Sequence, residues 1–384
     1  MLKNNSITRV GVIGLGNRIF ELLGLLINET DQIRIHAITD PDSLNIKRAQ
    51  DHISPDIKVF EDYKVMLADP EIDWVVIGSW NCFHAEHIIA ALDAGKHVFS
   101  EKPLATNLED CRAIERAVRS SDKMFSFGLV LRYSLFYQRL REIIEEMPLG
   151  KVLSFEFNET LHPNHGGYIM GNWRRLRENA GTHLLEKCCH DFDLANWMMD
   201  SVPVRVASFG GNDFFKPDYA GRSAEVGVNA EGKAAYMTWP DHNMLDPFTA
   251  EKTIVDNQVV IMEYANGARA TFHTNMHSTL PERRFYIMGT HGSVRGDVLT
   301  GEIEWARVAH QPDVVREKID GHGMHGGGDI VLVRSLIDSM LNGTLPKAGI
   351  DEALKSAIAC MSVDQALDRG EVVECSALYE GLLE

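Results

Sequence analysis

Two short stretches of the sequence carry side chains that can move a proton or stabilise charge. Glu101-Lys102-Pro103 directly follows the apolar run "HVFS". A lysine ammonium there can hydrogen-bond a reacting hydroxyl group, relay its proton and stabilise a developing alkoxide, and Pro103 restricts Lys102 to extended backbone. Glu186 and His190 are four residues apart in a helical pattern, which places them on one face. His190 is a candidate general base, because an imidazole titrates near neutral pH.

Each stretch also has a plain structural interpretation. Glu101 and Lys102 can form a surface ion pair, which contributes little to stability. Glu186 can be solvated, and His190 can be a hydrogen-bonded histidine of the core. The elements around these residues decide between the interpretations.

The first 130 residues alternate between short apolar runs and helical patterns. Strands buried on both faces and separated by helices form a parallel sheet with right-handed crossovers. The expected fold class is therefore α/β, with an N-terminal Rossmann domain containing a doubly wound parallel sheet. Ligands of such sheets bind beyond the carboxyl ends of the strands, which is where Glu101 and Lys102 lie. The expected strands lie within 7–16, 33–40, 57–60, 72–79, 97–100 and 123–133.

A glycine turn between the first strand and the first helix predicts a dinucleotide site. Gly14 and Gly16 match the first two glycines of GxGxxG, which form the tight turn and admit a pyrophosphate, whereas the third position is Ile19. Asp40 closes the second strand and can accept both adenosine ribose hydroxyls. No arginine immediately follows Asp40, so we expect NAD rather than NADP. The alternatives are a glycine-rich structural turn and Asp40 as a helix N-cap.

The second half has a different pattern. Alternating apolar and polar residues from about 151 onward, and Asn266-Gly267 between two such runs, predict a large, mostly antiparallel open sheet. We expect two domains, 1–130 for dinucleotide binding and 131–384 for substrate binding and oligomerisation. Helices near 329–342 and 351–368 cover the sheet or return to the first domain. An uncovered sheet face predicts a homodimer or homotetramer. Residues 210–250 form a long excursion rich in Gly, Asp, Asn and Pro.

Composition excludes several classes of protein. The 384 residues include 38 basic and 55 acidic side chains, a formal net charge of −17, which argues against nucleic-acid binding. The apolar runs are too short to span a bilayer, and the Met1 to Val10 stretch lacks the apolar core of a signal peptide. Six scattered cysteines without a CxxC pair fit a cytoplasmic protein. The many histidines show no spacing of a closed metal site, so we expect no metal; His322 and His325 lie in a glycine-rich loop that ends at Asp329, an expected helix N-cap.

Several motifs together resemble the family of glucose-fructose oxidoreductase, inositol dehydrogenase and rhizopine-catabolism oxidoreductase (Gfo/Idh/MocA). The resemblance covers nearly the whole chain and rests on "VGVIGLGNR", "IDWVVIGSWNCFHAEHIIAALDAGKHVFSEKPLA", "NWRR", "HLLEKCCHDFDLANWM" and "GTHGSVRGD". It implies a Rossmann domain, a C-terminal α/β domain with an open sheet, and oxidation or reduction of a hydroxyl carbon by a bound nicotinamide. The Glu-Lys-Pro motif, at Glu101, Lys102 and Pro103, is its most specific part.

The resemblance also implies roles for individual residues. Glu101 would lie near the nicotinamide ribose and amide, and His190 would accept a proton from the substrate. Glu186 stands where the family has aspartate, as orienter or substrate ligand, and Asp193 can orient the imidazole. Further cofactor candidates are Asn17, Arg18, Ser79, Trp80, Asn81, His84, Lys102 and Arg132, and further substrate candidates are Lys102, Trp173 and Arg174. Structural alternatives are that Asn81 only caps a helix and that Arg174 belongs to a basic surface patch.

The leading hypothesis is an NAD-dependent oxidoreductase that transfers a hydride between nicotinamide and a hydroxyl carbon of a sugar, cyclic polyol or sugar derivative. Lys102 and His190 would assist proton transfer. One alternative is a glycoside-processing enzyme that uses tightly bound NAD for transient oxidation. The other is a non-catalytic dinucleotide-sensing regulator.

Overall fold

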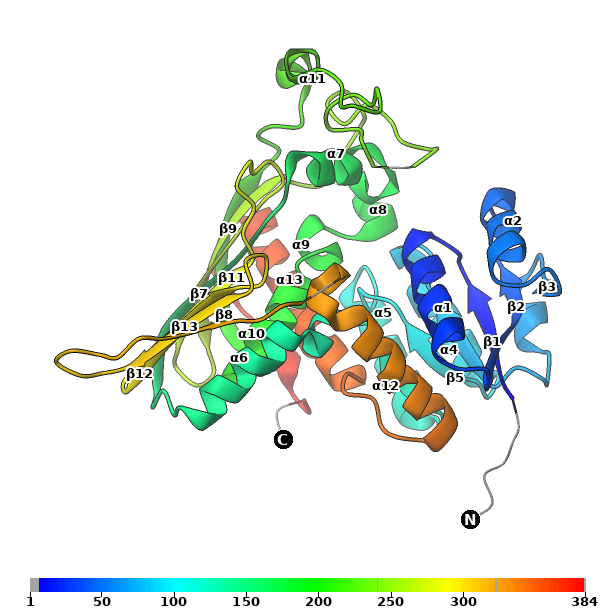
Figure 1. Cartoon of the computed structure of the whole chain (residues 1–384), viewed down its shortest axis with the longest axis horizontal. Coiled ribbons are helices and arrows are strands. Elements are labelled where there is room, and N and C mark those ends of the chain that lie inside the picture. The colour runs from blue at the N-terminus through cyan, green and yellow to red at the C-terminus, as the bar shows by residue number, and fades with distance from the viewer. Residues whose placement is uncertain (1–6, 240, 322, 383–384) are drawn as a thin grey trace. The chain divides into compact units, whose positions relative to one another are not determined.

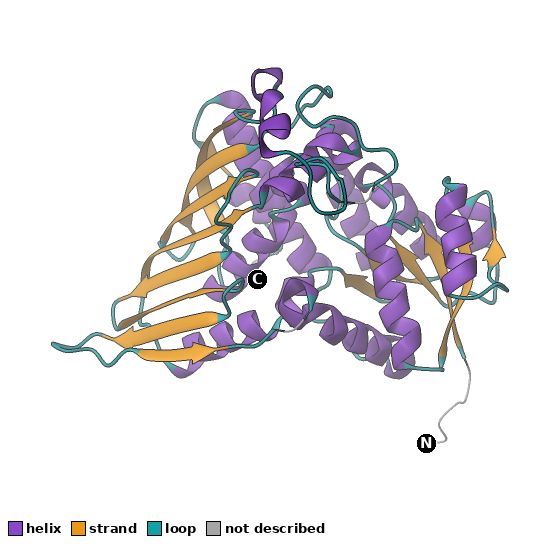
Figure 2. Ribbon diagram, turned by 45° about the horizontal axis from the view of Figure 1, so that its top comes forward, coloured by secondary structure: helices purple, strands orange, loops and turns teal. Residues whose placement is uncertain are grey.

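Two sheets organise the chain. The computed structural model describes residues 7–239, 241–321 and 323–382. The chain divides into one unit of Met1–Ser134 with Gly323–Ala357 and a second unit of Leu135–His322 with Ile358–Glu384. Figures 1 and 2 show the elements of each unit, which are described separately below.

The first unit contains a six-stranded, all-parallel sheet in the order β3-β2-β1-β4-β5-β6. Its central strands are apolar and buried on both faces, because helices cover both faces of a doubly wound sheet. The strand order reverses between β1 and β4, which defines the crevice where such sheets bind ligands. The strands are β1 (Thr8–Ile13), β2 (Ile33–Thr39), β3 (Lys58–Val59), β4 (Trp74–Ile77), β5 (His97–Ser100) and β6 (Phe125–Phe127).

The helices of the first unit come from both ends of the chain. α12 (Gly328–Asn342) lies beside α1 (Asn17–Glu29), as Figure 1 shows. The expected N-cap Asn107 is confirmed: its Oδ1 accepts the Asp110 N–H at 2.9 Å at the start of α5. The remaining helices are α2 (Ser43–His52), α3 (Tyr63–Leu67), α4 (His84–Asp93) and α5 (Leu108–Ser120), with short 3-10 turns η1 (Asn81–Phe83), η2 (Val130–Tyr133) and η5 (Met324–Gly327).

The second unit contains a nine-stranded mixed sheet in the order β14-β13-β12-β11-β7-β10-β9-β8-β15. β10 pairs with β7 in parallel, and the other pairs are antiparallel. Gly267, with φ +83°, makes the expected turn between β9 and β10. The strands are β7 (Val152–Thr160), β8 (Pro203–Gly211), β9 (Asn257–Tyr264), β10 (Arg269–Asn275), β11 (Arg284–Gly289), β12 (Gly292–Asp297), β13 (Glu302–Arg307), β14 (Val315–Lys318) and β15 (Val373–Glu374).

One face of this sheet is packed with aromatic side chains. Phe157 stacks on Phe285 at 5.4 Å and meets Phe192 of α10 edge-on at 5.5 Å, so α10 covers this face. The expected α/β architecture with a large, mostly antiparallel second sheet is confirmed. The helices and short turns are α6 (Leu135–Glu146), α7 (Pro163–Gly171), η3 (Trp173–Arg175), α8 (Arg177–Ala180), α9 (His183–Glu186), α10 (Cys189–Met199), η4 (Pro217–Tyr219), α11 (Gly221–Val226), α13 (Ile350–Arg369) and η6 (Ser376–Tyr379).

Two local expectations, and the alternative of Asp40 as an N-cap, are wrong. Residues 183–199 form two helices, because Cys188 has ψ of 1° and its carbonyl accepts the Asp191 N–H in a tighter turn. Asp42, not Asp40, caps α2 through the Leu44 N–H at 2.9 Å. Asp329 lies within the first turn of α12, whose N-cap is Gly327. None of the helices within the described ranges is long and apolar enough to cross a bilayer.

Candidate active site

The glycine turn after β1 has the geometry of a phosphate-binding loop. Gly14 has φ +84°, and a Cβ there would lie 2.5 Å from the Ser79 backbone nitrogen, so only glycine fits. Gly16 is the N-cap of α1, and a Cβ built on it would meet nothing within 4 Å. No side chain caps this helix and no acidic residue occupies its first turn. The exposed N–H groups therefore face open space that suits an anion.

Ile19 replaces the third glycine of the motif without loss of close packing. A Cβ built on Gly78, at the end of β4, would lie 1.8 Å from Cγ1 of Ile19. The motif normally has glycine on the helix at this position. Here the helix carries Ile19, and Gly78 at the end of the facing strand leaves room for it. The sequence analysis treated Ile19 as a departure from the motif and did not consider Gly78.

Asp40 lies against the glycine turn. Its Oδ2 accepts the Leu15 N–H at 2.5 Å, and its Oδ1 accepts the Asp42 N–H at 2.8 Å. Arg48 of α2, which the sequence analysis missed, donates to the Leu15 carbonyl at 2.7 Å and to Asn17 Oδ1 at 2.6 Å. An arginine therefore borders this turn even though none immediately follows Asp40 in the chain.

The four cofactor candidates in the loop after β4 differ in burial and in hydrogen bonding. His84 is buried, with Nδ1 2.7 Å from the Pro103 carbonyl and Nε2 3.2 Å from the Ser79 carbonyl, and burial lowers its pKa. It therefore joins this loop to the Glu-Lys-Pro segment. Ser79 Oγ lies 2.9 Å from His87 Nδ1. Asn81 is buried in η1, whereas Trp80 is exposed.

Glu101 is linked directly to the first turn of α1. Arg18 Nε donates to Glu101 Oε1 at 2.8 Å, and the Lys102 N–H donates to Oε2 at 3.2 Å. A Cβ on Gly128 would lie 3.0 Å from Glu101 Oε2, so glycine leaves space for this carboxylate. Lys102 itself is half-buried, and its peptide bond to Pro103 is cis. Arg132, half-buried in η2, follows β6.

The C-terminal part of the first unit extends this network. Arg18 Nη1 donates to Asp329 Oδ1 at 2.5 Å, and His325 Nδ1 lies 2.9 Å from Asp329 Oδ2. Burial opposes ionisation of Asp329, but the bonds from His325 and Arg18 lower its pKa overall. Asp329 was expected as a helix N-cap, and its bond to Arg18, 311 positions away, has no local signal in the sequence. His322, considered there beside His325, lies outside the described residues.

These groups fit a dinucleotide. The open N-terminus of α1 can receive a pyrophosphate. Asp40 bonds the Leu15 N–H of the glycine turn, and Glu101 bonds Arg18 in the first turn of the same helix. Arg18 Nη2 is buried and has no hydrogen-bond partner among the described residues. A buried unsatisfied donor of this kind marks a place for an acceptor.

In the second unit, three of the expected substrate residues come together. Arg174 Nε donates to Glu186 Oε1 at 3.0 Å, and the Arg174 guanidinium lies 4.3 Å from the Trp173 ring centroid. Tyr168 of α7, missed by the sequence analysis, accepts from Arg174 Nη1 at 3.5 Å. Arg174 is therefore held by a carboxylate and two aromatic rings and does not belong to a basic surface patch.

His190 and Asp193 are buried in the first turns of α10. Their neighbour Asp191 is fully buried and binds Arg283 through two hydrogen bonds of 2.8 Å. Arg283 also lies 3.0 Å from Glu159, which lies 3.3 Å from Lys187 Nζ. Burial raises the pKa of Asp191 to about 7, more than the Arg283 guanidinium lowers it. The sequence analysis did not find this buried cluster, whose members lie far apart along the chain.

Among the residues that the structure describes, two groups of side chains have ligand atoms close enough together for a metal ion, and both already contain a cation. Glu159, Cys188 and Asp191 surround Arg283, and burial raises the pKa of the Cys188 thiol, which disfavours the thiolate that metals bind. The other group, His36, Asp69 and Glu71, surrounds Lys58 at 3.0 and 3.2 Å from its carboxylates.

Comparison with known proteins identifies the family. The model of the oxidoreductase family with an NAD-binding Rossmann fold matches residues 8–129, and the model of the GFO/IDH/MocA C-terminal domain matches residues 137–295. The chain belongs to the Gfo/Idh/MocA oxidoreductase family. The first match covers the whole parallel sheet and the glycine turn, and the second covers β7 to β11 of the mixed sheet, so this Gfo/Idh/MocA protein is an oxidoreductase with an NAD-binding fold.

Relatives of this Gfo/Idh/MocA protein include enzymes of different names. It is 31% identical over 197 residues to an inositol 2-dehydrogenase of Gluconacetobacter diazotrophicus, covering 51% of this chain and 55% of that one. It is 26% identical over 283 residues to a 2,7-anhydro-N-acetylneuraminate hydratase of Escherichia coli, and the match covers 71% of this chain and 73% of the relative. A levoglucosan dehydrogenase solved with NADH and levoglucosan has the same fold, with a TM-score of 0.77, 18% identity and coverage of 97% and 100%.

Proposed function

We propose that this protein is an NAD-dependent dehydrogenase that oxidises a hydroxyl carbon of a sugar, cyclic polyol or sugar derivative. The observation that carries the proposal is the bond from Arg18 to Glu101. It connects the Glu-Lys-Pro segment at the carboxyl end of β5 to the helix end that suits a pyrophosphate. The named dehydrogenases among the relatives support the substrate class.

The proposed reaction assigns one task to each side chain. NAD, when bound, supplies the hydride acceptor. Lys102 hydrogen-bonds the reacting oxygen and stabilises its developing negative charge. His190 accepts the hydroxyl proton. Arg174, held between Glu186 and the Trp173 ring, orients the substrate through hydrogen bonds from its guanidinium.

The preferred cofactor in this proposal is NAD rather than NADP. A carboxylate at Asp40 can accept ribose hydroxyls and repels a 2′-phosphate. Arg48, the nearby cation, is engaged with the Leu15 carbonyl and Asn17. The dissociation constants for NADH and NADPH should differ at least tenfold in favour of NADH, and Asp40→Ser should reduce that ratio. Tighter binding of NADPH by the unmodified protein would contradict the assignment.

The function is tested by NADH production with a panel of sugars and inositols. Lys102→Ala and His190→Ala should each lower kcat by about 10²–10⁴-fold. Lys151→Ala and His310→Ala, which remove an exposed lysine and an exposed histidine, serve as matched controls and should leave kcat unchanged. Wild-type rates in both Lys102→Ala and His190→Ala would refute the mechanism.

A second candidate is transient oxidation with tightly held NAD and no net redox change. The E. coli relative named as a hydratase favours it, since hydration changes no oxidation state overall. In that case NAD should co-purify with the protein, and product should form from an anhydro sugar or glycoside without added NAD. Strict dependence on added NAD would favour the dehydrogenase.

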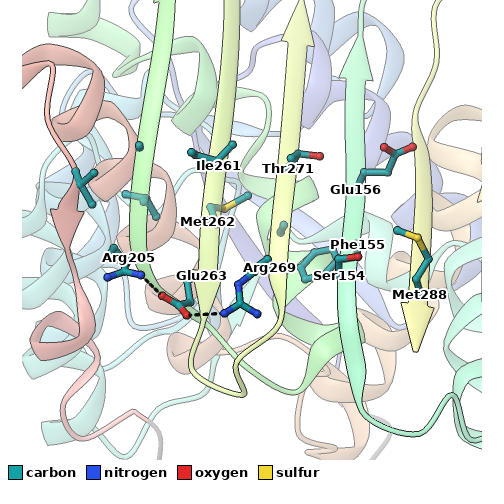
Figure 3. A pocket seen from close by; sticks show the side chains of 14 residues that line it. Ser154, Phe155, Glu156, Arg205, Ile261, Met262, Glu263, Arg269, Thr271 and Met288 are labelled. Carbon is teal, nitrogen blue, oxygen red and sulfur yellow. Dashed lines mark hydrogen bonds and ion pairs between the residues drawn. The ribbon is translucent and has the colours of Figure 1, made fainter. Parts of the chain in front are cut away.

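We also propose that the protein forms a homo-oligomer through the outer face of the second sheet. Figure 3 shows this face, where Ile261 and Thr271 lie above ion pairs of Glu263 with Arg205 and Arg269. Apolar side chains exposed on it, including Phe209, Val259 and Ile261, favour burial by a partner. A monomeric mass in light scattering at micromolar concentration would contradict this proposal.

A further inference from the structure

The β8–β9 connection, residues 212–256, is far longer than a usual strand connection, and long connections are commonly functional or disordered. Its base is closed by a single buried carboxylate. Asp256 Oδ1 accepts the Asp213 N–H at 2.7 Å, and Oδ2 accepts the N–H groups of Phe214 and Phe215 at 2.8 and 2.7 Å. The two ends of the connection are therefore fixed to each other.

The connection also has a core that packs on α7, and Figure 1 shows it beside α7 and α8. Two glycines of α7 allow close approach. A Cβ on Gly167 would lie 2.0 Å from the Tyr236 carbonyl oxygen, and one on Gly171 would lie 2.6 Å from that of Leu245. The Leu245 N–H donates to the Gly171 carbonyl at 2.8 Å. The shared core consists of Leu161, Ile169, Met170, Phe215, Tyr236, Phe248, Ile254 and Met276.

This attachment places one large aromatic side chain at the surface. Tyr236 has φ +68°, an unfavourable conformation for a residue with a side chain, and its N–H donates to Asn164 Oδ1 at 2.8 Å. Three residues later, Trp239 stacks on His165 with ring centroids 4.4 Å apart and an interplanar angle of 30°. It also meets Tyr168 at 5.2 Å. Trp239 nevertheless keeps 42% of its surface exposed.

Trp239 is joined to the candidate substrate residues through one ring. Tyr168 lies between Trp239 and the Arg174 guanidinium, 5.6 Å from its ring centroid, and Arg174 holds Glu186. An exposed indole linked through Tyr168 to a guanidinium and a carboxylate combines an apolar face with nearby hydrogen-bonding groups. A pyranose ring has matching features, a C–H face and a rim of hydroxyl groups. An acyclic polyol offers no such rigid face.

We propose that Trp239 is a stacking platform for a sugar ring of the substrate, and that the protein acts on ring sugars rather than on acyclic polyols. The effect on catalysis rests on the proposed dehydrogenase function. Binding of a sugar ring to Trp239 does not depend on that function. The β8–β9 connection holds the indole in place through its attachment to α7. Trp239 contacts the substrate and takes no part in proton or hydride transfer.

Tryptophan fluorescence of the full-length protein tests binding directly. Titration with methyl β-D-glucopyranoside and levoglucosan should change the emission of the unmodified protein and of Trp305→Phe, the matched control on β13. The change should be smaller in Trp239→Phe, in which Trp173 beside Arg174 can still respond. D-glucitol should produce none. An equal response in Trp239→Phe and Trp305→Phe would overturn the proposal.

Steady-state kinetics test whether Trp239 contributes to the binding of a ring substrate during turnover. With the best ring substrate of the sugar panel, Trp239→Ala should raise KM about tenfold, consistent with the loss of one stacking surface, and change kcat less than threefold. Trp239→Phe should recover part of the loss, whereas the NADH dissociation constant and Tm of both variants should stay unchanged. An unaltered KM in Trp239→Ala, or turnover of D-glucitol as efficient as that of any ring sugar, would refute the platform.

Failure of the proposed function gives a different pattern. A protein that neither binds NADH nor turns over any sugar would refute the dehydrogenase. The fluorescence titration still decides the platform in that case, because it requires no cofactor.

Discussion

The two units each contain a cluster of charges built around one arginine, and the clusters differ in what they leave available. In the first unit, Arg18 joins Glu101 and Asp329, and Asp329 is held by His325. We call this group the Arg18 cluster. In the second unit, the Arg283 cluster joins Arg283 to Asp191, Glu159 and Lys187.

Exposure and hydrogen bonding separate the two clusters. The Arg283 side chain is 7% exposed, and all three of its guanidinium nitrogens contact carboxylates. The Arg18 side chain is 25% exposed, and its Nη2 has no hydrogen-bond partner among the described residues. The Arg283 cluster leaves a buried acceptor, Glu159 Oε2, without a partner among the described residues, whereas the Arg18 cluster leaves a donor beside a helix N-terminus, where it can bind an anionic ligand. The same residue types thus serve different purposes, depending on what surrounds them.

The largest expected effect is on stability. Arg283→Met should lower the free energy of unfolding by about 3–5 kcal/mol, because it leaves the buried carboxylates of Asp191 and Glu159 without their shared cation. Urea unfolding at pH 7 measures this loss. Arg18→Met should cost less than half as much, since its partners are nearer to solvent. Equal losses in the two variants would remove the distinction between the clusters.

The pH dependence of stability should differ between the clusters. The pKa of Asp191 is raised from 3.8 to about 7, so the folded protein favours its protonated carboxyl group. The stability that this group contributes is fully present below about pH 4 and is lost as pH rises to about 7. Asp191→Asn cannot ionise at this position, so its free energy of unfolding relative to that of the wild-type protein should improve as pH rises over that range.

The matched variant is Asp329→Asn in the Arg18 cluster. The pKa of Asp329 is lowered, so its contribution is present above about pH 4 and lost only at lower pH. Between pH 4.5 and 7 the ionisation of residue 329 itself should add no change to the stability difference between this variant and wild type, so a change in that range reports its partner His325. Urea unfolding at pH 4.5, 5.5 and 7.0 compares both variants, and parallel pH profiles for Asp191→Asn and wild type would contradict the assignment.

A smaller effect concerns cofactor binding. Arg18→Met should raise the NADH dissociation constant about tenfold, equivalent to about 1.4 kcal/mol, because it releases Glu101 and removes the unused donor. Isothermal titration calorimetry of the unmodified protein and the variant measures the change.

Arg334 supplies the control for this experiment. Arg334 pairs with Glu29, which joins α12 to the other end of α1. Arg334→Met therefore perturbs the same two helices away from the glycine turn, and both its NADH affinity and its stability should change by less than about 0.5 kcal/mol. A tenfold loss of NADH affinity in Arg334→Met would show that the effect of Arg18→Met is not specific to the turn.

Local sequence patterns determined much of the first unit. Apolar strands separated by helical patterns predicted the parallel sheet, and Gly14 needed only its immediate neighbours to specify a turn with positive φ. The position of Glu101 and Lys102 after β5 followed from the same pattern. The Asn266-Gly267 hairpin was likewise determined locally, since two adjacent residues set the turn.

Tertiary structure alone decided what these residues contact. Arg18 and Asp329 are 311 positions apart, and Gly78 accommodates Ile19 from another strand, so neither partner has a local signal. The break at Cys188 and the stacking of Trp239 on His165 also depend on packing between distant segments. The sequence by itself specified strands, turns and the types of chemical group, because these depend on neighbouring residues. Which groups meet, which remain available and which are closed off by burial depend on long-range packing, which no local pattern encodes.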